Sequence, residues 1–85
     1  MSDVLTIVVD LVEQVTGVDA TELADGTRFE RLAGWTSLEA LRLLTAVEQR
    51  FGVGLDLREY FAASTLADLV ALIHAGLADA GQRPA

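Results

Sequence analysis

Hydrophobic residues recur every three or four positions in three stretches of the chain, the spacing at which they line one face of an α-helix. They fall at positions 4, 7, 8, 11, 12 and 15 in the first stretch, at Ala40, Leu43, Leu44, Val47 and Phe51 in the second, and at Leu66, Leu69, Val70, Ile73 and Leu77 in the last. Each stripe predicts an amphipathic helix with one buried face. The first stretch is rich in valine and isoleucine, which are poor helix formers, so a strand over residues 5–9 is the alternative there.

Residues that favour helix ends flank the first two stripes. Ser2 or Asp3 can cap the first helix, and Gly17 can end it. The second helix is predicted over residues 37–51, with Gly52 at its end.

The start of the second helix has the sequence of a capping box. Thr36 and Glu39 are three residues apart, so each side chain can accept a hydrogen bond from the backbone amide of the other. Thr36 is then the N-cap, and Ser37 is the first helical residue. A similar pair, Thr65 and Asp68, precedes the last helix.

The remaining segments complete an all-α fold. Residues 17–36 show no period and contain three glycines, so they predict a long loop, in which a short helical turn is possible. Asp56 can cap a short third helix over residues 57–61. We therefore predict a three-to-four-helix bundle with a long first loop, one domain over residues 1–80 and a flexible tail over 81–85. The apolar residues expected to hold the loop against the core are Leu23, Phe29, Leu32 and Trp35.

The composition narrows the class of partner. The 85 residues are 52% hydrophobic and include no cysteine, so the core forms without disulfides. Thirteen acidic residues against six arginines give a formal net charge of −7, which repels nucleic acid and anionic membranes. We find neither a signal peptide nor an apolar run long enough for a bilayer, and we expect a cytoplasmic protein.

The residue sets needed for catalysis or metal binding are missing from the sequence. A nucleophilic serine needs a base, and the single histidine, His74, falls one position beyond the core stripe of the last helix, where we expect it at the surface. There is no nucleophile elbow, no nucleotide-binding loop and no His or Cys cluster. We therefore expect neither enzymatic activity nor a metal. Ser37 has another possible role, because free N–H groups and the helix dipole at a helix N-terminus favour an attached phosphodiester.

The ordered set of these elements resembles the acyl carrier protein family. The stretch GWTSLEALRLLTAVEQRFGVGL resembles the family's second helix, which begins with Asp-Ser-Leu, and FERL before it and STLADLVALI after it extend the resemblance over nearly the whole chain. The resemblance implies that Ser37 carries 4′-phosphopantetheine, installed from coenzyme A by a phosphopantetheinyl transferase. The thiol of that arm would hold acyl or aminoacyl groups as thioesters.

Two departures from the family concern partner binding. Thr36 replaces the usual aspartate, which keeps the helix cap and removes a negative charge beside Ser37. This is either a neutral exchange of caps or a change in partner choice. The second helix is uncharged overall, whereas it is strongly acidic in many family members. Arg42 on this helix is either a solvated side chain or the partner of an acid on another protein.

A partner-binding surface is predicted around Ser37. Leu38 lies off the core stripe, so we predict that it is an exposed contact for partner enzymes, whereas Leu41 can equally turn into the core. Trp35 either anchors the long loop, which we favour, or contacts a partner or the arm. The full set of candidate partner-binding residues is Trp35, Thr36, Leu38, Leu41, Arg42 and Thr45.

We interpret the chain as a discrete, monomeric carrier protein of a bacterial polyketide or nonribosomal pathway. The Gly-Trp-x-Ser-Leu motif, the exclusive use of arginine and the high alanine content are similar to stand-alone carriers of such pathways. Expected partners are a phosphopantetheinyl transferase, a loading enzyme (an acyltransferase or an adenylation or ligase enzyme), and a ketosynthase or other pathway enzymes. The alternatives are a carrier for fatty acid synthesis, which the uncharged second helix disfavours, and an unmodified helical interaction module.

Overall fold

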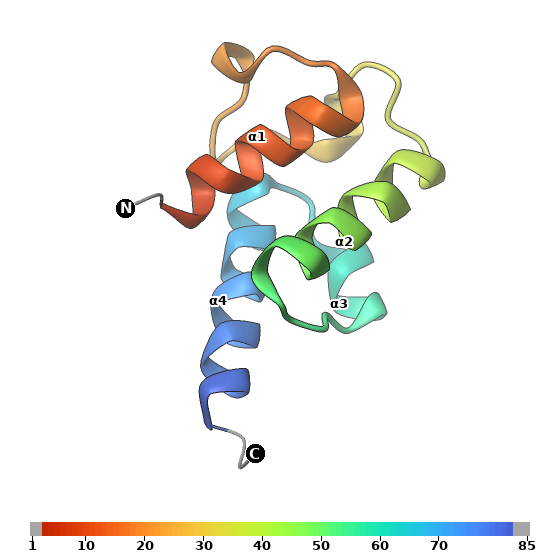
Figure 1. Cartoon of the computed structure of the whole chain (residues 1–85). Helices are drawn as coiled ribbons and strands as arrows, with labels where there is room; N and C mark the ends of the chain where they lie inside the picture. Colours follow the sequence, from red (N-terminus) through yellow and green to blue (C-terminus); the bar gives the residue numbers. More distant parts are fainter. Residues whose placement is uncertain (1–2, 83–85) are drawn as a thin grey trace.

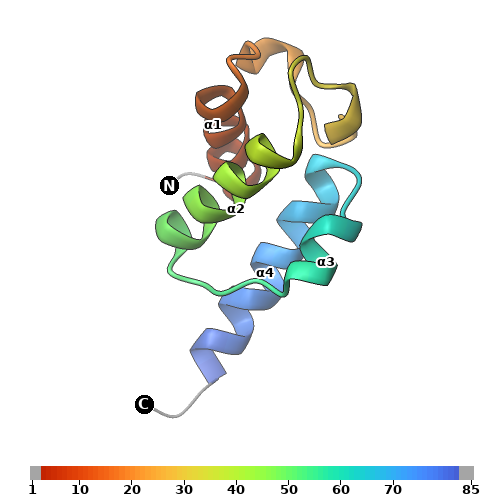
Figure 2. The same cartoon turned by 90° about the vertical axis from the view of Figure 1, so that its right-hand side faces the viewer.

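The computed structural model describes residues 3–82, which form four α-helices and two short 3₁₀ turns. In chain order these elements are α1 (Val4–Thr16), η1 (Ala20–Glu22), η2 (Phe29–Arg31), α2 (Ser37–Phe51), α3 (Leu57–Ala62) and α4 (Leu66–Gln82). Helix α1 packs against both α2 and α4, and α3 packs against α4 (Figures 1 and 2). The predicted all-α bundle with a long first loop and a short third helix is confirmed.

The first stretch is a helix and not a strand. Its apolar face is buried against α2 and α4, and this burial outweighs the low helix propensity of its β-branched residues. Gly17 ends α1 in the left-handed conformation, with φ of 77°. Asp3 occupies the N-cap position, but its carboxylate makes no capping bond; Ser2 lies outside the described residues.

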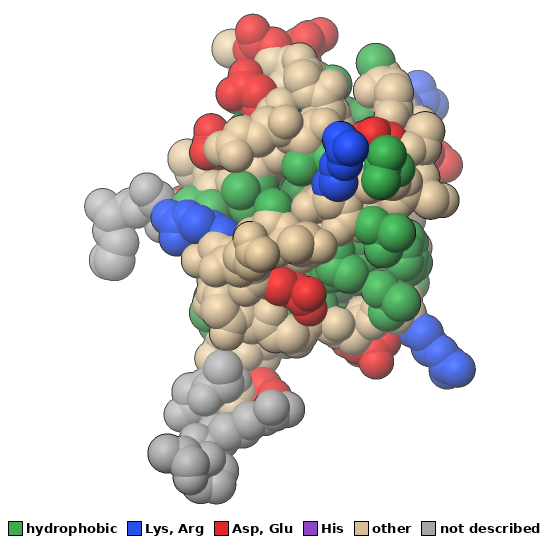
Figure 3. All heavy atoms as spheres, turned by 45° about the vertical axis from the view of Figure 1, so that its right-hand side comes forward, with side chains coloured by type: hydrophobic (Ala, Val, Ile, Leu, Met, Phe, Trp, Pro, Cys, Tyr) green, Lys and Arg blue, Asp and Glu red, His purple; other side chains and the backbone are tan. Residues whose placement is uncertain are grey.

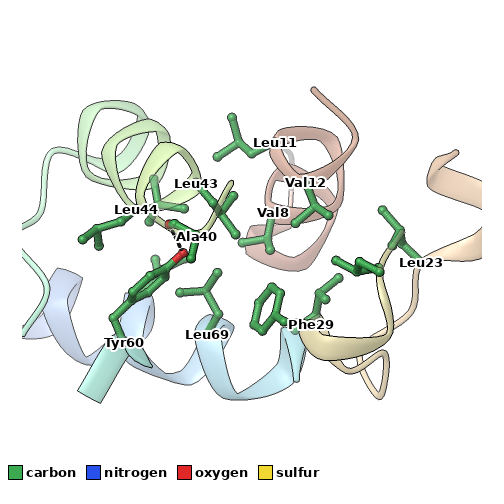
Figure 4. Close-up of a cluster of buried hydrophobic side chains, with 14 residues drawn as sticks. Val8, Leu11, Val12, Leu23, Phe29, Ala40, Leu43, Leu44, Tyr60 and Leu69 are labelled. Atoms are coloured by element: carbon green, nitrogen blue, oxygen red, sulfur yellow. Dashed lines mark hydrogen bonds between the residues drawn. The ribbon is translucent and has the colours of Figure 1, made fainter. Parts of the chain in front are cut away.

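One hydrophobic core joins all four helices and the first loop (Figure 4). Its fully buried side chains are Val8, Val12, Leu43, Val47, Leu66, Leu69 and Ile73. The prediction that Leu77 is buried is wrong, since its side chain is 37% exposed. Figure 1 shows the reason, because the last turns of α4 project past the other helices. Helix α4 also continues to Gln82, two residues into the segment predicted as a tail, and residues 83–85 lie outside the described part.

The long loop between α1 and α2 is fixed to the start of α4 by backbone hydrogen bonds. The Phe29 amide donates to the Ser64 carbonyl at 3.0 Å, and the Leu66 amide donates to the Thr27 carbonyl at 3.1 Å. These bonds surround an isolated antiparallel bridge between Arg28 and Thr65. They satisfy the polar groups of the loop backbone and an otherwise free amide of the first turn of α4.

The predicted apolar anchors of this loop are confirmed. Leu23, Phe29 and Leu32 are buried in the core. Trp35 is half-buried and stacks on Phe29, with ring centroids 5.0 Å apart and planes 20° from parallel. Because Trp35 directly precedes Thr36, the N-cap of α2, this stacking holds the loop in place where the chain enters that helix.

The predicted cap of α4 is also present. The Asp68 carboxylate accepts hydrogen bonds from the amides of Ser64 and Thr65, at 3.0 and 3.2 Å, and the Asp68 amide donates to the Thr65 hydroxyl. The backbone hydrogen bond from Ser64 is the main reason that the pKa of Asp68 lies below its usual value. None of the helices within residues 3–82 has the length and apolar character needed to cross a membrane.

Candidate functional site

The site is built on the N-terminus of α2, which begins at Ser37 as predicted. Thr36 is the N-cap in an extended conformation, and its hydroxyl oxygen accepts a hydrogen bond from the Leu38 amide at 3.2 Å. The Glu39 carboxylate accepts a bond from the Thr36 amide, also at 3.2 Å. This reciprocal pair is the predicted capping box, and it fixes the orientation of the first helical turn.

The capping box also determines where the negative charge of Glu39 lies. The Thr36 hydroxyl donates a hydrogen bond to the Glu39 carboxylate, and this bond is the main reason that the pKa of Glu39 is lowered. The nearby charge of Arg42 lowers the pKa further by a smaller amount. Glu39 therefore stays ionised at neutral pH, with its charge directed at the backbone before Ser37.

Ser37 is exposed, and its hydroxyl makes no hydrogen bond to any residue in the described part of the chain. Its amide, at the first helical position, has no partner among residues 3–82 either. A phosphodiester on this oxygen would meet the positive end of the α2 dipole and an N–H group that is still free to donate. The donors and the space at Ser37 thus fit a phosphate-linked arm.

The residues predicted to surround Ser37 lie at the surface. Leu38 is 54% exposed, and Leu41, for which burial was an equal alternative, is 46% exposed. Arg42 and Thr45 are exposed as well, although the Thr45 hydroxyl donates to the Leu41 carbonyl at 3.1 Å. The role of these residues in binding partners remains a prediction.

Two further apolar side chains, which the sequence analysis missed, lie exposed on the neighbouring helix α3. They are Leu57 and Phe61. Tyr60 is the only residue of this short helix that is buried, so Leu57 and Phe61 are left exposed. Phe61 and Trp35 help to line a hollow of about 200 Å³ between α3 and the first loop.

Tyr60 also helps to position the helix that carries Ser37, a role that the sequence analysis did not identify. Its ring is buried in the core, and its hydroxyl donates a hydrogen bond to the Ala40 carbonyl in the first turns of α2 (Figure 4). Burial raises the pKa of the Tyr60 phenol. This bond joins α3 to the helix that begins with Ser37.

The described residues offer no alternative chemical centre. His74 is exposed, as predicted. No three His, Asp or Glu side chains within residues 3–82 gather in an arrangement that could hold a metal ion.

Comparison with known proteins agrees with this geometry. The sequence model of the family described as "Phosphopantetheine attachment site" matches residues 6–73. The chain belongs to the acyl carrier protein family. Carrier proteins of this family attach 4′-phosphopantetheine and are not catalytic. No curated protein matches the carrier at the level required for a relationship.

The fold of the carrier is shared with a solved structure. This is the hexanoyl acyl carrier protein, a non-natural intermediate, from the actinorhodin polyketide synthase in Streptomyces coelicolor, solved by NMR. The two chains are 27% identical, the match covers 92% of the carrier and 90% of the actinorhodin chain, and the TM-score is 0.69. The predicted family and fold are both confirmed.

Proposed function

We propose that Ser37 carries the 4′-phosphopantetheine arm and that the protein transports acyl or aminoacyl intermediates of a bacterial polyketide or nonribosomal pathway. The observation that carries this proposal is the exposed, unpaired Ser37 hydroxyl at the first position of α2. Once attached, the arm supplies a thiol that holds the intermediates as thioesters.

Attachment requires only that Ser37 act as an acceptor. Its oxygen forms a bond to the phosphorus that carries the pantetheine part of coenzyme A, the pyrophosphate bond breaks, and adenosine bisphosphate leaves. The hydroxyl proton passes to a base of the transferase, because no histidine of the carrier is near: His74 lies on α4. The contribution of the carrier is to present the hydroxyl on a rigid, capped helix end.

The assignment to a polyketide or nonribosomal pathway is supported by two observations. The similar solved structure is a carrier of a polyketide synthase. Helix α2 carries Glu39 and Glu48 against Arg42 and Arg50, so it lacks the surplus negative charge that we associate with carriers of fatty acid synthesis. We propose a cytoplasmic, monomeric carrier for such a pathway.

The surface beside Ser37 supports a set of visiting enzymes. We propose that the transferase, a loading enzyme (an acyltransferase or an adenylation or ligase enzyme) and a ketosynthase or another pathway enzyme contact Leu38 and its neighbours. An exposed leucine next to the attachment point can be buried by each enzyme in turn. The other proposed contacts are Trp35, Thr36, Leu41, Arg42 and Thr45.

Mass spectrometry of the intact protein tests the attachment site. After incubation with coenzyme A and a transferase of broad specificity, the wild-type protein is expected to gain the mass of one arm. Ser37→Ala is expected to gain none and to keep its fold, because Thr36 still caps α2. Ser64→Ala is the matched control, since Ser64 is also exposed but lies in the turn before α4.

The outcomes separate the alternatives. A gain of mass by Ser37→Ala would place the arm elsewhere. If the wild-type protein gains no mass while a standard carrier is modified in the same mixture, the chain is an unmodified interaction module.

A further inference from the structure

Four large hydrophobic side chains are exposed on the neighbouring helices α2 and α3. We call these residues, Leu38, Leu41, Leu57 and Phe61, the seam patch. Figure 3 shows hydrophobic side chains gathered over α2 and α3, with the side chains of both basic and acidic residues at the edges of this area. Exposed clusters of this kind on a small monomeric protein commonly mark a surface that binds another protein.

The acidic side chains of α2 do not project from the seam patch. Glu39 and Glu48 are both half-buried. Glu39 accepts the bonds of the capping box, and Glu48 accepts a hydrogen bond from the Leu55 amide at 2.9 Å. Glu39 is thus directed at the backbone before α2 and Glu48 at the loop after it, where each carboxylate is less available to a cationic partner.

The acidic side chains at α3 make contacts on the side of that helix that faces α4. Asp56 caps the helix by accepting a hydrogen bond from the Glu59 amide at 3.1 Å. Glu59 lines hollows on the other side of α3, together with residues of α4 such as Leu72. Both side chains are exposed, but none of these contacts involves a residue of α2.

Two positive side chains also project beside the seam patch. Arg42 follows Leu41 on α2, and Arg58 follows Leu57 on α3; both are exposed. The salt bridge formed within residues 3–82 is Arg28–Glu30, in the first loop, so neither Arg42 nor Arg58 forms a salt bridge with a described residue. Arg42 and Arg58 therefore place two exposed positive charges beside the seam patch, on a chain whose net charge is −7.

We propose that the seam patch docks enzymes whose own docking surface is apolar at its centre and acidic at its edge, with carboxylates that pair with Arg42 and Arg58. The proposal rests on the proposed function in one respect, namely that docking there brings Ser37 to the enzyme. The apolar centre supplies contact area, and the two arginine–carboxylate pairs select the partner and speed its approach.

Two synthetic helical peptides provide the test. They share one leucine stripe, and the residues flanking it are all Glu in one peptide and all Lys in the other. Binding to the full-length protein is measured by fluorescence anisotropy at about 0.01 M ionic strength, where the screening length is about 30 Å. The Glu peptide is expected to bind about fivefold more tightly or better, as two exposed charge pairs allow, and to shift NMR signals of α2 and α3.

Matched charge reversals locate the effect. Arg42→Glu and Arg58→Glu are each expected to reduce the preference for the Glu peptide by about twofold or more. Arg50→Glu is the control, because it changes the net charge by the same amount. Arg50 lies on the side of α2 that faces α1, where it lines a hollow with Ile7 and Asp10, so this variant is expected to change the preference for the Glu peptide less.

Tighter binding of the Lys peptide would overturn the proposal, because the overall negative charge would then determine partner choice. An equal effect of Arg42→Glu and Arg50→Glu would overturn it too. The mass gain at Ser37 is measured separately on the same proteins, so a failure of the proposed function is distinguishable from a failure of the charge preference.

Discussion

The hydrogen bond from Tyr60 to Ala40 should contribute to the stability of the protein in a way that depends on pH. Tyr60 is the only tyrosine of the chain, which also contains no cysteine and no lysine. Arginine stays protonated throughout the accessible pH range. The phenol of Tyr60 is therefore the main side chain that titrates above about pH 9. Replacing it by phenylalanine removes the hydroxyl and keeps the buried ring.

The size of the effect follows from the burial of Tyr60 and the pKa shift. Losing one net buried hydrogen bond costs about 1 kcal/mol of unfolding free energy, which for a domain of this size lowers the melting temperature by about 4–8 °C. Because burial raises the pKa of Tyr60 in the folded state, the unfolded chain loses its phenol proton first as the pH rises. The stabilising contribution is complete below the unfolded pKa of about 10, and by about pH 11 the wild-type protein loses about 1.4 kcal/mol. Tyr60→Phe has no phenol, so its unfolding free energy does not fall in this way as the pH rises.

Urea unfolding at a series of pH values, followed by circular dichroism, measures both the contribution of the hydrogen bond and its loss at high pH. The wild-type protein is expected to be more stable than Tyr60→Phe by about 1 kcal/mol at neutral pH, and the two free energies should meet near pH 11. Parallel curves for the two proteins up to pH 11 would refute the reasoning, because they would show that the phenol is not buried and bonded in the folded state.

Three other changes test the N-terminal half of α2. Leu38→Ala should change the unfolding free energy by less than about 1 kcal/mol, since the Leu38 side chain is 54% exposed, but it should slow loading by a cognate enzyme about tenfold. The control is Leu43→Ala, which should lower the unfolding free energy by about 2–5 kcal/mol because Leu43 is fully buried. Equal destabilisation by both would contradict this assignment of faces. Thr36→Asp should change the unfolding free energy by less than about 1 kcal/mol, because both residues are good caps. It should also speed modification by a transferase with a basic docking surface, and this gain should depend on salt. Equal modification rates of the two proteins at low salt would contradict this prediction. Thr36→Ala should raise the pKa of Glu39 toward its usual value in an NMR titration, because the main cause of the lowered pKa is removed; an unchanged pKa would exclude the Thr36 hydroxyl as that cause.

The helices and the position of Ser37 could be predicted because they depend on local rules. Capping and hydrophobic periodicity act over three or four residues, so the sequence around Thr36 and Glu39 was enough to locate the start of α2. The failure at Leu77 involves residues distant in sequence. Leu77 continues the stripe of α4, yet whether it is buried depends on how far the other helices extend beside it.

The contacts that hold the site together could not be predicted for the same reason, because they join residues that are distant in sequence. The Tyr60–Ala40 bond joins residues 20 apart, and the bridge from Arg28 to Thr65 joins the first loop to α4. Neither pairing has a pattern of its own in the sequence. The exposed pair Leu57 and Phe61 could not be assigned to a surface beside Leu41 until the packing of α3 was known.

The arrangement of charge shows why net charge is a poor guide to the partners of this carrier. The molecule extends 41 Å along its longest axis, whereas charges in physiological salt are screened over about 8 Å. Of its thirteen acidic residues, seven precede Thr36, on α1 and in the first loop. A partner that buries the seam patch meets mainly the charges within one screening length of it, which include Arg42 and Arg58 as well as Glu39 and Asp56. The remote acidic residues contribute to solubility and to long-range repulsion at low salt, so raising the salt concentration should favour the local positive charges in the choice of partner.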